Sequence, residues 1–140
     1  MISIHDIDHV VLRVRDIDAM RRFYCDVLGA THIAWRPEFG MSHLKAGRSM
    51  IDLITVDGKL GKAGGAAPGR EGRNLDHLCL RVEPFEQEAI VAHLKRHGVA
   101  VGEIRRRYGA EGNGISIYVS DPEGNTVELK GPSDGEPPPA

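Results

Sequence analysis

The sequence predicts an α+β fold built from two copies of a βαβββ module. Residues 7–14 and 75–82 are identical at five of eight positions, and each segment precedes a helical pattern and then strand-like segments. A repeat of this kind indicates that one structural unit occurs twice. The glycine-rich segment 57–74 separates the copies. We therefore expect a first module at 1–56, a flexible linker at 57–74 and a second module at 75–130.

The first copy starts with a strand of alternating apolar residues and continues into a helix over residues 16–28. Asp16 is a suitable N-cap and Gly29 a suitable stop for this helix. The apolar residues between them recur at helical spacing: Ile17, Met20, Tyr24, Val27 and Leu28. Three strands are expected after the helix, at about 31–36, 40–46 and 49–56.

The second copy repeats this order. Pro84 suits the first turn of a helix expected over residues 84–97, and Gly98 follows as its stop. The residues of segment 121–125, Asp-Pro-Glu-Gly-Asn, are typical of a tight turn and should join the last two strands. The three expected strands are 99–107, 115–119 and 126–130. Residues 131–140 contain four prolines, so we expect a disordered tail there.

Composition narrows the class of protein. The chain has 140 residues, 41% of them hydrophobic, which is enough to form a core without disulfides. Its net charge of −2 argues against nucleic acid or an anionic membrane as a partner. The two cysteines, Cys25 and Cys79, suggest no disulfide framework, and no apolar run approaches the roughly 18 residues of a membrane span. We expect a cytoplasmic protein.

Strand alternation predicts a metal site. In each copy the apolar residues of the first and last strands fall on one face, which must meet the helix. The opposite face then carries His9 and Asp52 in the first copy and His77 and Glu128 in the second. Imidazole and carboxylate ligands suit Zn²⁺, Mn²⁺, Fe²⁺, Co²⁺ or Ni²⁺. The alternative is that the repeated Asp-His pair is a turn or capping feature and that the two acids face solvent.

The same face is expected to bind substrate. Arg105, Arg106 and Arg107 precede a glycine-rich stretch at 109–114 and suggest a mobile basic loop that meets an anionic group. Tyr118 is a candidate hydrogen-bond donor to substrate, or alternatively a packing residue. Four residues are therefore candidates for substrate binding: Arg13, Arg81, Arg107 and Tyr118.

At this point the chain resembles the vicinal oxygen chelate superfamily, which includes glyoxalase I, fosfomycin-resistance thiol transferases, bleomycin-binding proteins, methylmalonyl-CoA epimerases and extradiol dioxygenases. The resemblance covers nearly the whole chain. Four segments carry it, the last being the most specific: Ile7-Asp8-His9-Val10, residues 23–29, Leu75-Asp76-His77 and residues 121–129.

The resemblance implies a curved, barrel-like mixed sheet with the helices outside. It also implies one divalent metal per site, held by the first-strand histidine and the last-strand carboxylate of each module. His9, His77 and Glu128 match these positions. Asp52 departs from the glyoxalase I pattern, where glutamate is usual. Without it, the ligands would be the three-residue set of the thiol transferases and dioxygenases.

The leading hypothesis from this resemblance is a metal-dependent lyase or isomerase of glyoxalase type, with Glu128 or Asp52 as the catalytic base. An Fe²⁺-dependent extradiol-type dioxygenase or a thiol transferase is an alternative, and a non-catalytic protein that sequesters a drug or metabolite is another. The expected substrate is a small molecule, with an anion or a thiol conjugate as the candidates. Two-module relatives commonly pair modules between chains, so a homodimer is expected.

Overall fold

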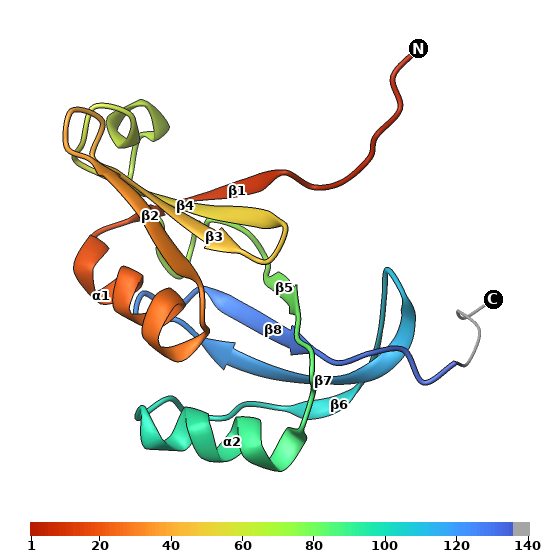
Figure 1. Cartoon of the computed structure of the whole chain (residues 1–140). Helices are drawn as coiled ribbons and strands as arrows, with labels where there is room; N and C mark the ends of the chain where they lie inside the picture. The colour runs from red at the N-terminus through yellow and green to blue at the C-terminus, as the bar shows by residue number, and fades with distance from the viewer. Residues whose placement is uncertain (136–140) are drawn as a thin grey trace. The chain divides into compact units, whose positions relative to one another are not determined.

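The computed structural model describes residues 1–135 and divides the chain after Asn74 into two compact units (Figure 1). The first unit contains β1 (His9–Val14), α1 (Ile17–Arg22), the π-helical turn η1 (Phe23–Val27), β2 (Thr31–Arg36), β3 (Met41–Ala46), β4 (Ser49–Thr55) and the 3-10 turn η2 (Gly61–Gly64). The second contains β5 (Leu78–Arg81), α2 (Gln87–Arg96), β6 (Ile104–Gly109), β7 (Gly112–Ser120) and β8 (Thr126–Lys130). The prediction of an α+β chain with two βαβββ modules is confirmed.

Both units have the same sheet topology. The strand orders are β1-β4-β3-β2 and β5-β8-β7-β6. In each sheet the first strand is parallel to the last, and the remaining pairs are antiparallel. A parallel pair needs a long crossover connection, and the helix and two middle strands of each unit lie within that connection.

One face of the first sheet forms an apolar core under α1, which packs on β3 and β4. Asp16 caps α1 by accepting a hydrogen bond from the Ala19 N–H, and Gly29 ends the helical segment with φ +85°, as the sequence predicts. The buried apolar residues come from both the sheet and the helical segment: Leu12, Val14, Met20, Phe23, Tyr24, Leu44, Ile51 and Leu53.

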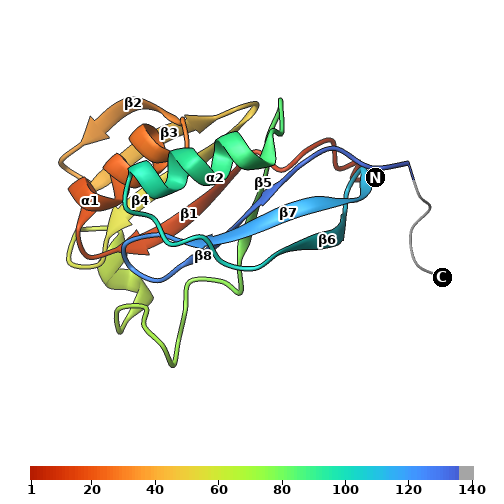
Figure 2. The ribbon, with the colours of Figure 1, turned by 90° about the horizontal axis from the view of Figure 1, so that it is seen from below.

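The core of the second unit follows the same alternation. Its buried apolar residues on the strands are Ile117, Val119, Val127 and Leu129. Within this unit α2 lies below the sheet in Figure 1 and faces the viewer in Figure 2, and Leu94 is its buried residue. The helix begins at Gln87 after the N-cap Glu86, so the prediction that Pro84 occupies its first turn is wrong.

The glycine-rich segment between the modules is organised around Arg13 of β1. The guanidinium donates hydrogen bonds to the carbonyl oxygens of Gly61, Gly64, Gly65 and Ala66, at 2.7–3.2 Å. The Asn74 side chain pairs with the backbone N–H and C=O of Arg13, each at 3.0 Å. The sequence predicts a flexible linker here because the segment has little to bury. In the structure one cation contacts four of its carbonyl oxygens.

Two other segments are more regular than the sequence predicts. Residues 105–107 belong to β6, which forms a tight hairpin with β7, instead of a mobile basic loop. Residues 131–134, the start of the expected disordered tail, are held by hydrogen bonds from Gly131 N–H to Ile115 O and from Asp134 N–H to Asn113 O. The rest of that expected tail, 136–140, lies outside the described residues.

The turn between β7 and β8 has the structure that its composition predicts. The Asp121 carboxylate accepts hydrogen bonds from the backbone N–H groups of Glu123 and Asn125 and from the Asn125 side chain, at 2.8–2.9 Å. Gly124 has φ +85°. These contacts set the register that brings Glu128 opposite Tyr118. No helix within residues 1–135 is long and apolar enough to cross a membrane.

Candidate functional site

The two predicted histidine ligands have the same local structure. His9 donates from Nδ1 to the carboxylate of the preceding Asp8 at 2.6 Å, and His77 donates from Nδ1 to Asp76 at 2.7 Å. A histidine that ligates a metal usually donates its other ring N–H to a carboxylate in this way, which fixes the ring and leaves Nε2 as the lone-pair donor. In each Asp-His pair the carboxylate therefore fixes the ring through Nδ1.

The two predicted carboxylate ligands are also equivalent. Asp52 and Glu128 lie on β4 and β8, opposite residues of the first strand of their units, and both are buried, with 6% and 4% exposure. Carboxylates buried to this degree need partners that compensate for lost solvation. In each unit these partners come from the neighbouring strands.

In the first unit the partner of Asp52 is His43 of β3. The two residues face each other in the β3–β4 register, and His43 Nδ1 donates to Asp52 Oδ1 at 2.8 Å. Arg36 Nε donates to His43 Nε2 at 3.2 Å, which identifies the Nδ1–H tautomer. The Asp8 hydrogen bond raises the pKa of His9, and the charge of Asp52 adds to this rise.

Sequence reasoning assigned no role to His43. The pairing of His43 with Asp52 could have been predicted from strand alternation, because the two residues lie on the same face once β3 and β4 are paired in the observed register. That register depends on a hairpin turn whose position the sequence pattern locates only approximately.

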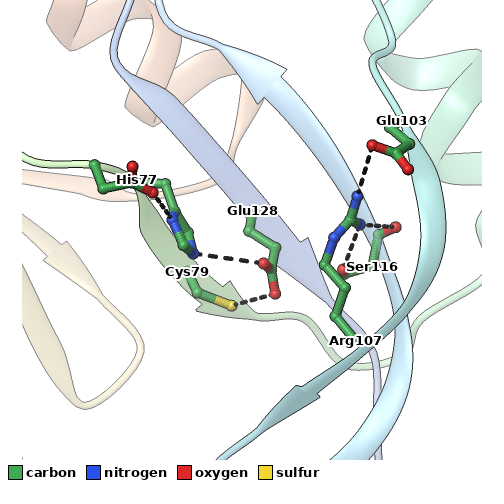
Figure 3. A network of polar contacts seen from close by, with 7 residues as sticks. His77, Cys79, Glu103, Arg107, Ser116 and Glu128 are labelled. Carbon is green, nitrogen blue, oxygen red and sulfur yellow. Dashed lines mark hydrogen bonds and ion pairs between the residues drawn. The ribbon is translucent and has the colours of Figure 1, made fainter.

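In the second unit the Glu128 carboxylate faces both His77 and Cys79, which lie on the same side of it (Figure 3). Glu128 Oε1 is 3.6 Å from His77 Nε2, and Oε2 accepts a hydrogen bond from the Cys79 thiol at 3.1 Å. Burial raises the pKa of Cys79 to about 12, with the hydrogen bond to Glu128 and its negative charge as further causes. Cys79 is therefore a protonated donor to Glu128 at neutral pH.

Tyr118 and Arg107 extend the polar face of the second unit beyond Glu128. The Tyr118 ring centroid is 5.8 Å from that of His77, and the Arg107 guanidinium carbon is 3.7 Å from the Tyr118 centroid. Arg107 also donates from Nη1 to Ser116 Oγ at 2.8 Å, and its Nη2 is 3.6 Å from Glu103 (Figure 3). The structure thus brings two of the predicted substrate-binding residues together beside Glu128.

The other two predicted substrate-binding residues have protein partners of their own. Arg13 donates to the carbonyl oxygens of the glycine-rich segment, as described above. Arg81 forms ion pairs with Glu111 at 3.0 Å and with Glu83 at 3.7 Å. A role for either residue in substrate binding stays a prediction.

Each unit presents the donor set of half a metal site. Within residues 1–135 no group of three or more His, Cys, Asp and Glu side chains is gathered as a formed metal-binding cluster. A histidine and a buried carboxylate nevertheless share one face in each unit, and nitrogen and oxygen donors of this kind fit the divalent transition metals. The donor types present in each unit therefore fit such a metal.

Comparison with known proteins agrees with this geometry. The family model of the Glyoxalase/Bleomycin resistance protein/Dioxygenase superfamily matches residues 6–129. The chain belongs to this superfamily. Its match includes both Asp-His pairs and both buried carboxylates, and it runs through both βαβββ modules.

The proteins similar to this chain include a virulence protein, a protein from a mobile metagenome and an epimerase. Virulence protein STM3117 of Salmonella typhimurium is 31% identical over 126 residues, which cover 88% of this chain and 81% of that protein. Its crystal structure has a TM-score of 0.78, with 28% identity and coverage of 94% and 99%. Protein VPC_CASS1 from the mobile metagenome of V. Pseudocholerae has a TM-score of 0.80, with 26% identity and coverage of 96% and 99%. Mouse mitochondrial methylmalonyl-CoA epimerase is 27% identical over 129 residues, covering 89% of this chain and 71% of the epimerase.

Proposed function

We propose that this superfamily member is a divalent-metal-dependent lyase or isomerase of glyoxalase type that acts on a small oxygenated metabolite. The observation that carries the proposal is the repeated Asp-His pair, with hydrogen bonds of 2.6 and 2.7 Å that hold both rings through Nδ1, on the side opposite Nε2. A capping role would not require the same orienting hydrogen bond twice, each on the face that carries a buried carboxylate.

The proposed ligands are His9 and Asp52 of one unit with His77 and Glu128 of another. The second unit belongs either to the same chain or to a second copy in a homodimer, and both arrangements would unite two unlike half-sites. A bound metal would supply Lewis-acid stabilisation of the charge that develops on substrate oxygens.

The chain's own residues then account for proton transfer. Glu128 and Asp52 are the candidate bases, because each is a buried carboxylate that could take a proton beside a carbonyl and return it to the neighbouring carbon. Cys79 and His43 hold these carboxylates by hydrogen bonds of 3.1 and 2.8 Å, so they are positioning residues. Tyr118 faces Glu128 and would border the substrate. The likeness to a methylmalonyl-CoA epimerase supports an isomerase in particular.

The first test is metal binding by the full chain. Metal-free protein is titrated with Ni²⁺, Zn²⁺ or Mn²⁺ by calorimetry, and His77→Ala is compared with His32→Ala, a matched change of an exposed strand histidine. We expect His77→Ala to weaken binding at least tenfold, the order of effect seen for changes around metal sites, and His32→Ala to leave it unchanged. Equal metal affinity in the two variants would show that His77 is not a metal ligand.

The second test is turnover. Protein loaded with each metal is mixed with methylglyoxal and a thiol, and thioester formation is followed by absorbance. We expect activity that Glu128→Gln abolishes. A protein that binds metal but forms no thioester with any metal would not be a glyoxalase. An empty site insensitive to His77→Ala would favour sequestration of a drug or metabolite.

A further inference from the structure

The C-terminal end of α2 carries two histidines on one side of the helix. His93 lies in the last turn and His97 is the C-cap, four positions later, and residues at this spacing are neighbours on a helix surface. The centroids of the two rings are 4.4 Å apart, with the ring planes at 48°. His93 is half-buried and His97 is exposed. The two imidazole rings therefore lie next to each other at the protein surface.

A hydrogen bond determines which nitrogen of His97 is a candidate ligand. His97 Nδ1 donates to the backbone carbonyl oxygen of His93 at 3.0 Å. Because a carbonyl oxygen only accepts, the proton is on Nδ1 and the lone pair is on Nε2. A backbone carbonyl often orients a metal-ligating histidine in this way. His93 needs only one of its two ring nitrogens for ligation, so a hydrogen bond at the other nitrogen is compatible with a bound metal.

The histidine pair is separate from the proposed catalytic site. Helix α2 lies on one side of the second sheet, and its Leu94 is buried (Figure 1). Val127 and Leu129 of β8 belong to the apolar core, and Glu128 between them points to the opposite face of the sheet. The pair therefore lies on the side of the sheet opposite Glu128.

The position at the end of a helix favours a cation. The last carbonyl groups of a helix give its C-terminus a partial negative charge, which attracts positive charge within the last turn. Imidazole nitrogen suits late transition metals such as Cu²⁺, Ni²⁺ and Zn²⁺. Two histidines four positions apart on one helix face are also the ligand pair of helical zinc motifs. Spacing, ring orientation and charge thus agree on a divalent metal as the ligand.

We propose that His93 and His97 form a metal site of their own, in which both imidazoles bind one Cu²⁺, Ni²⁺ or Zn²⁺ ion. Within residues 1–135 no third His, Cys, Asp or Glu side chain joins the pair, so water completes the coordination. Of the three ions Cu²⁺ should bind most tightly. A metal that bridges this helical turn binds the folded helix and thereby stabilises the end of α2. The inference does not depend on the proposed function, because neither histidine is a ligand there.

The test is a titration with Cu²⁺ alone of full-length His77→Ala protein, in which the proposed catalytic site lacks one ligand. Isotope-labelled protein is followed by NMR at about pH 7.5, because neutral imidazole is the ligand and paramagnetic Cu²⁺ broadens the amide signals of nearby residues. We expect the signals of residues 93–97 to broaden first and the effect to saturate. Broadening that begins in another segment, or that spreads without preference for α2, would overturn the proposal.

The decisive variant is His97→Ala in the same background, with His32→Ala as its control because His32 is an exposed strand histidine. Loss of one of two ligands should weaken Cu²⁺ binding at α2 at least tenfold, since even changes beside a metal ligand have effects of this size. His32→Ala should leave the affinity unchanged. Equal affinities in the two variants would show that His97 does not bind the ion.

A double substitution separates chelation by the pair from the mere number of histidines. Lys95→His combined with His97→Ala restores the number, but residues two positions apart on a helix do not face each other. We expect Cu²⁺ affinity to stay as weak as in His97→Ala. An affinity restored to that of the His77→Ala protein would mean that the spacing is irrelevant, and the proposed pair would then be wrong.

Discussion

The contact between Cys79 and Glu128 predicts an unreactive thiol that one substitution makes reactive. Burial and Glu128 raise the pKa of Cys79 from 9.0 to about 12. The thiolate is the reactive form, so the wild-type thiol should alkylate slowly. Glu128→Gln keeps the shape of the side chain but removes its charge, and the pKa of Cys79 should then fall.

The size of the effect follows from the two pKa values. At pH 8 a thiol of pKa 9.0 is about one-tenth ionised and one of pKa 12 about one part in ten thousand. A more basic thiolate is a better nucleophile, which offsets part of this thousandfold difference and leaves a rate roughly 30- to 60-fold slower. In Glu128→Gln each unit by which the pKa falls should accelerate alkylation about threefold. Cys79 is an exposed residue, but partial desolvation of its thiol, the largest cause, remains, so its pKa should stay above 9.0 and the rate below that of the peptide thiol.

The assay is alkylation by iodoacetamide between pH 7 and 11, with peptide mass mapping to separate Cys79 from Cys25. Solvent-exposed cysteine in a short peptide supplies the reference rate. A Cys79 rate equal to that of the peptide, or a midpoint of its pH profile near 9, would refute the hydrogen bond to Glu128. An unchanged rate in Glu128→Gln would show that burial alone protects the thiol.

The same pKa difference carries a stability prediction, and two further substitutions test the structure elsewhere. Between pH 9.0 and about 12 the unfolded chain loses the Cys79 proton while the native state keeps it, so the free energy of unfolding should decrease as pH rises through this range, and less so in Cys79→Ala. Arg13→Met should lower the free energy of unfolding, measured by urea denaturation, by about 2 kcal/mol, because four carbonyl oxygens lose a charged donor. As a control, Arg48→Met at an exposed position should change this free energy little. Loss of hydrogen-exchange protection at residues 61–66 should accompany the Arg13 change. Asp121→Ala should lower the free energy of unfolding by about 3 kcal/mol, because it removes the acceptor of three hydrogen bonds, and Asp121→Asn should lower it less. Equal effects of the two substitutions would exclude the carboxylate as the main support of this turn.

Local patterns located most of the secondary structure. The strands predicted at 31–36 and 126–130 agree with β2 and β8 residue for residue, and the Asp16 cap and Gly29 stop are as expected. Capping, turn chemistry and strand alternation depend on neighbours a few residues away, so a single sequence contains the information. The predicted start of α2 was three residues too early. Pro84 is suited to the first turn of a helix, but a proline does not oblige a helix to begin at its position.

The contacts that the sequence could not predict are those between residues that are distant in the sequence. The glycine-rich segment has no apolar residues to predict order, yet Arg13, about fifty positions earlier, satisfies its carbonyl groups. Residues 131–134 follow the last strand and read as tail, but they pair with β7. A single charged side chain or a free strand edge can order such segments. The pattern of neighbouring residues in the sequence does not indicate this.

By itself the sequence determined the repeat, which follows from the identity of residues 7–14 and 75–82. It also determined the two apolar faces and the four side chains proposed as ligands, because these follow from alternation along single strands. Tertiary structure decided which residues contact the two carboxylates: His43 contacts Asp52, and Cys79 contacts Glu128. Each of these contacts depends on strand register, which is set by packing and turn geometry over the whole sheet, and a shift of one residue would turn every one of these side chains to the other face.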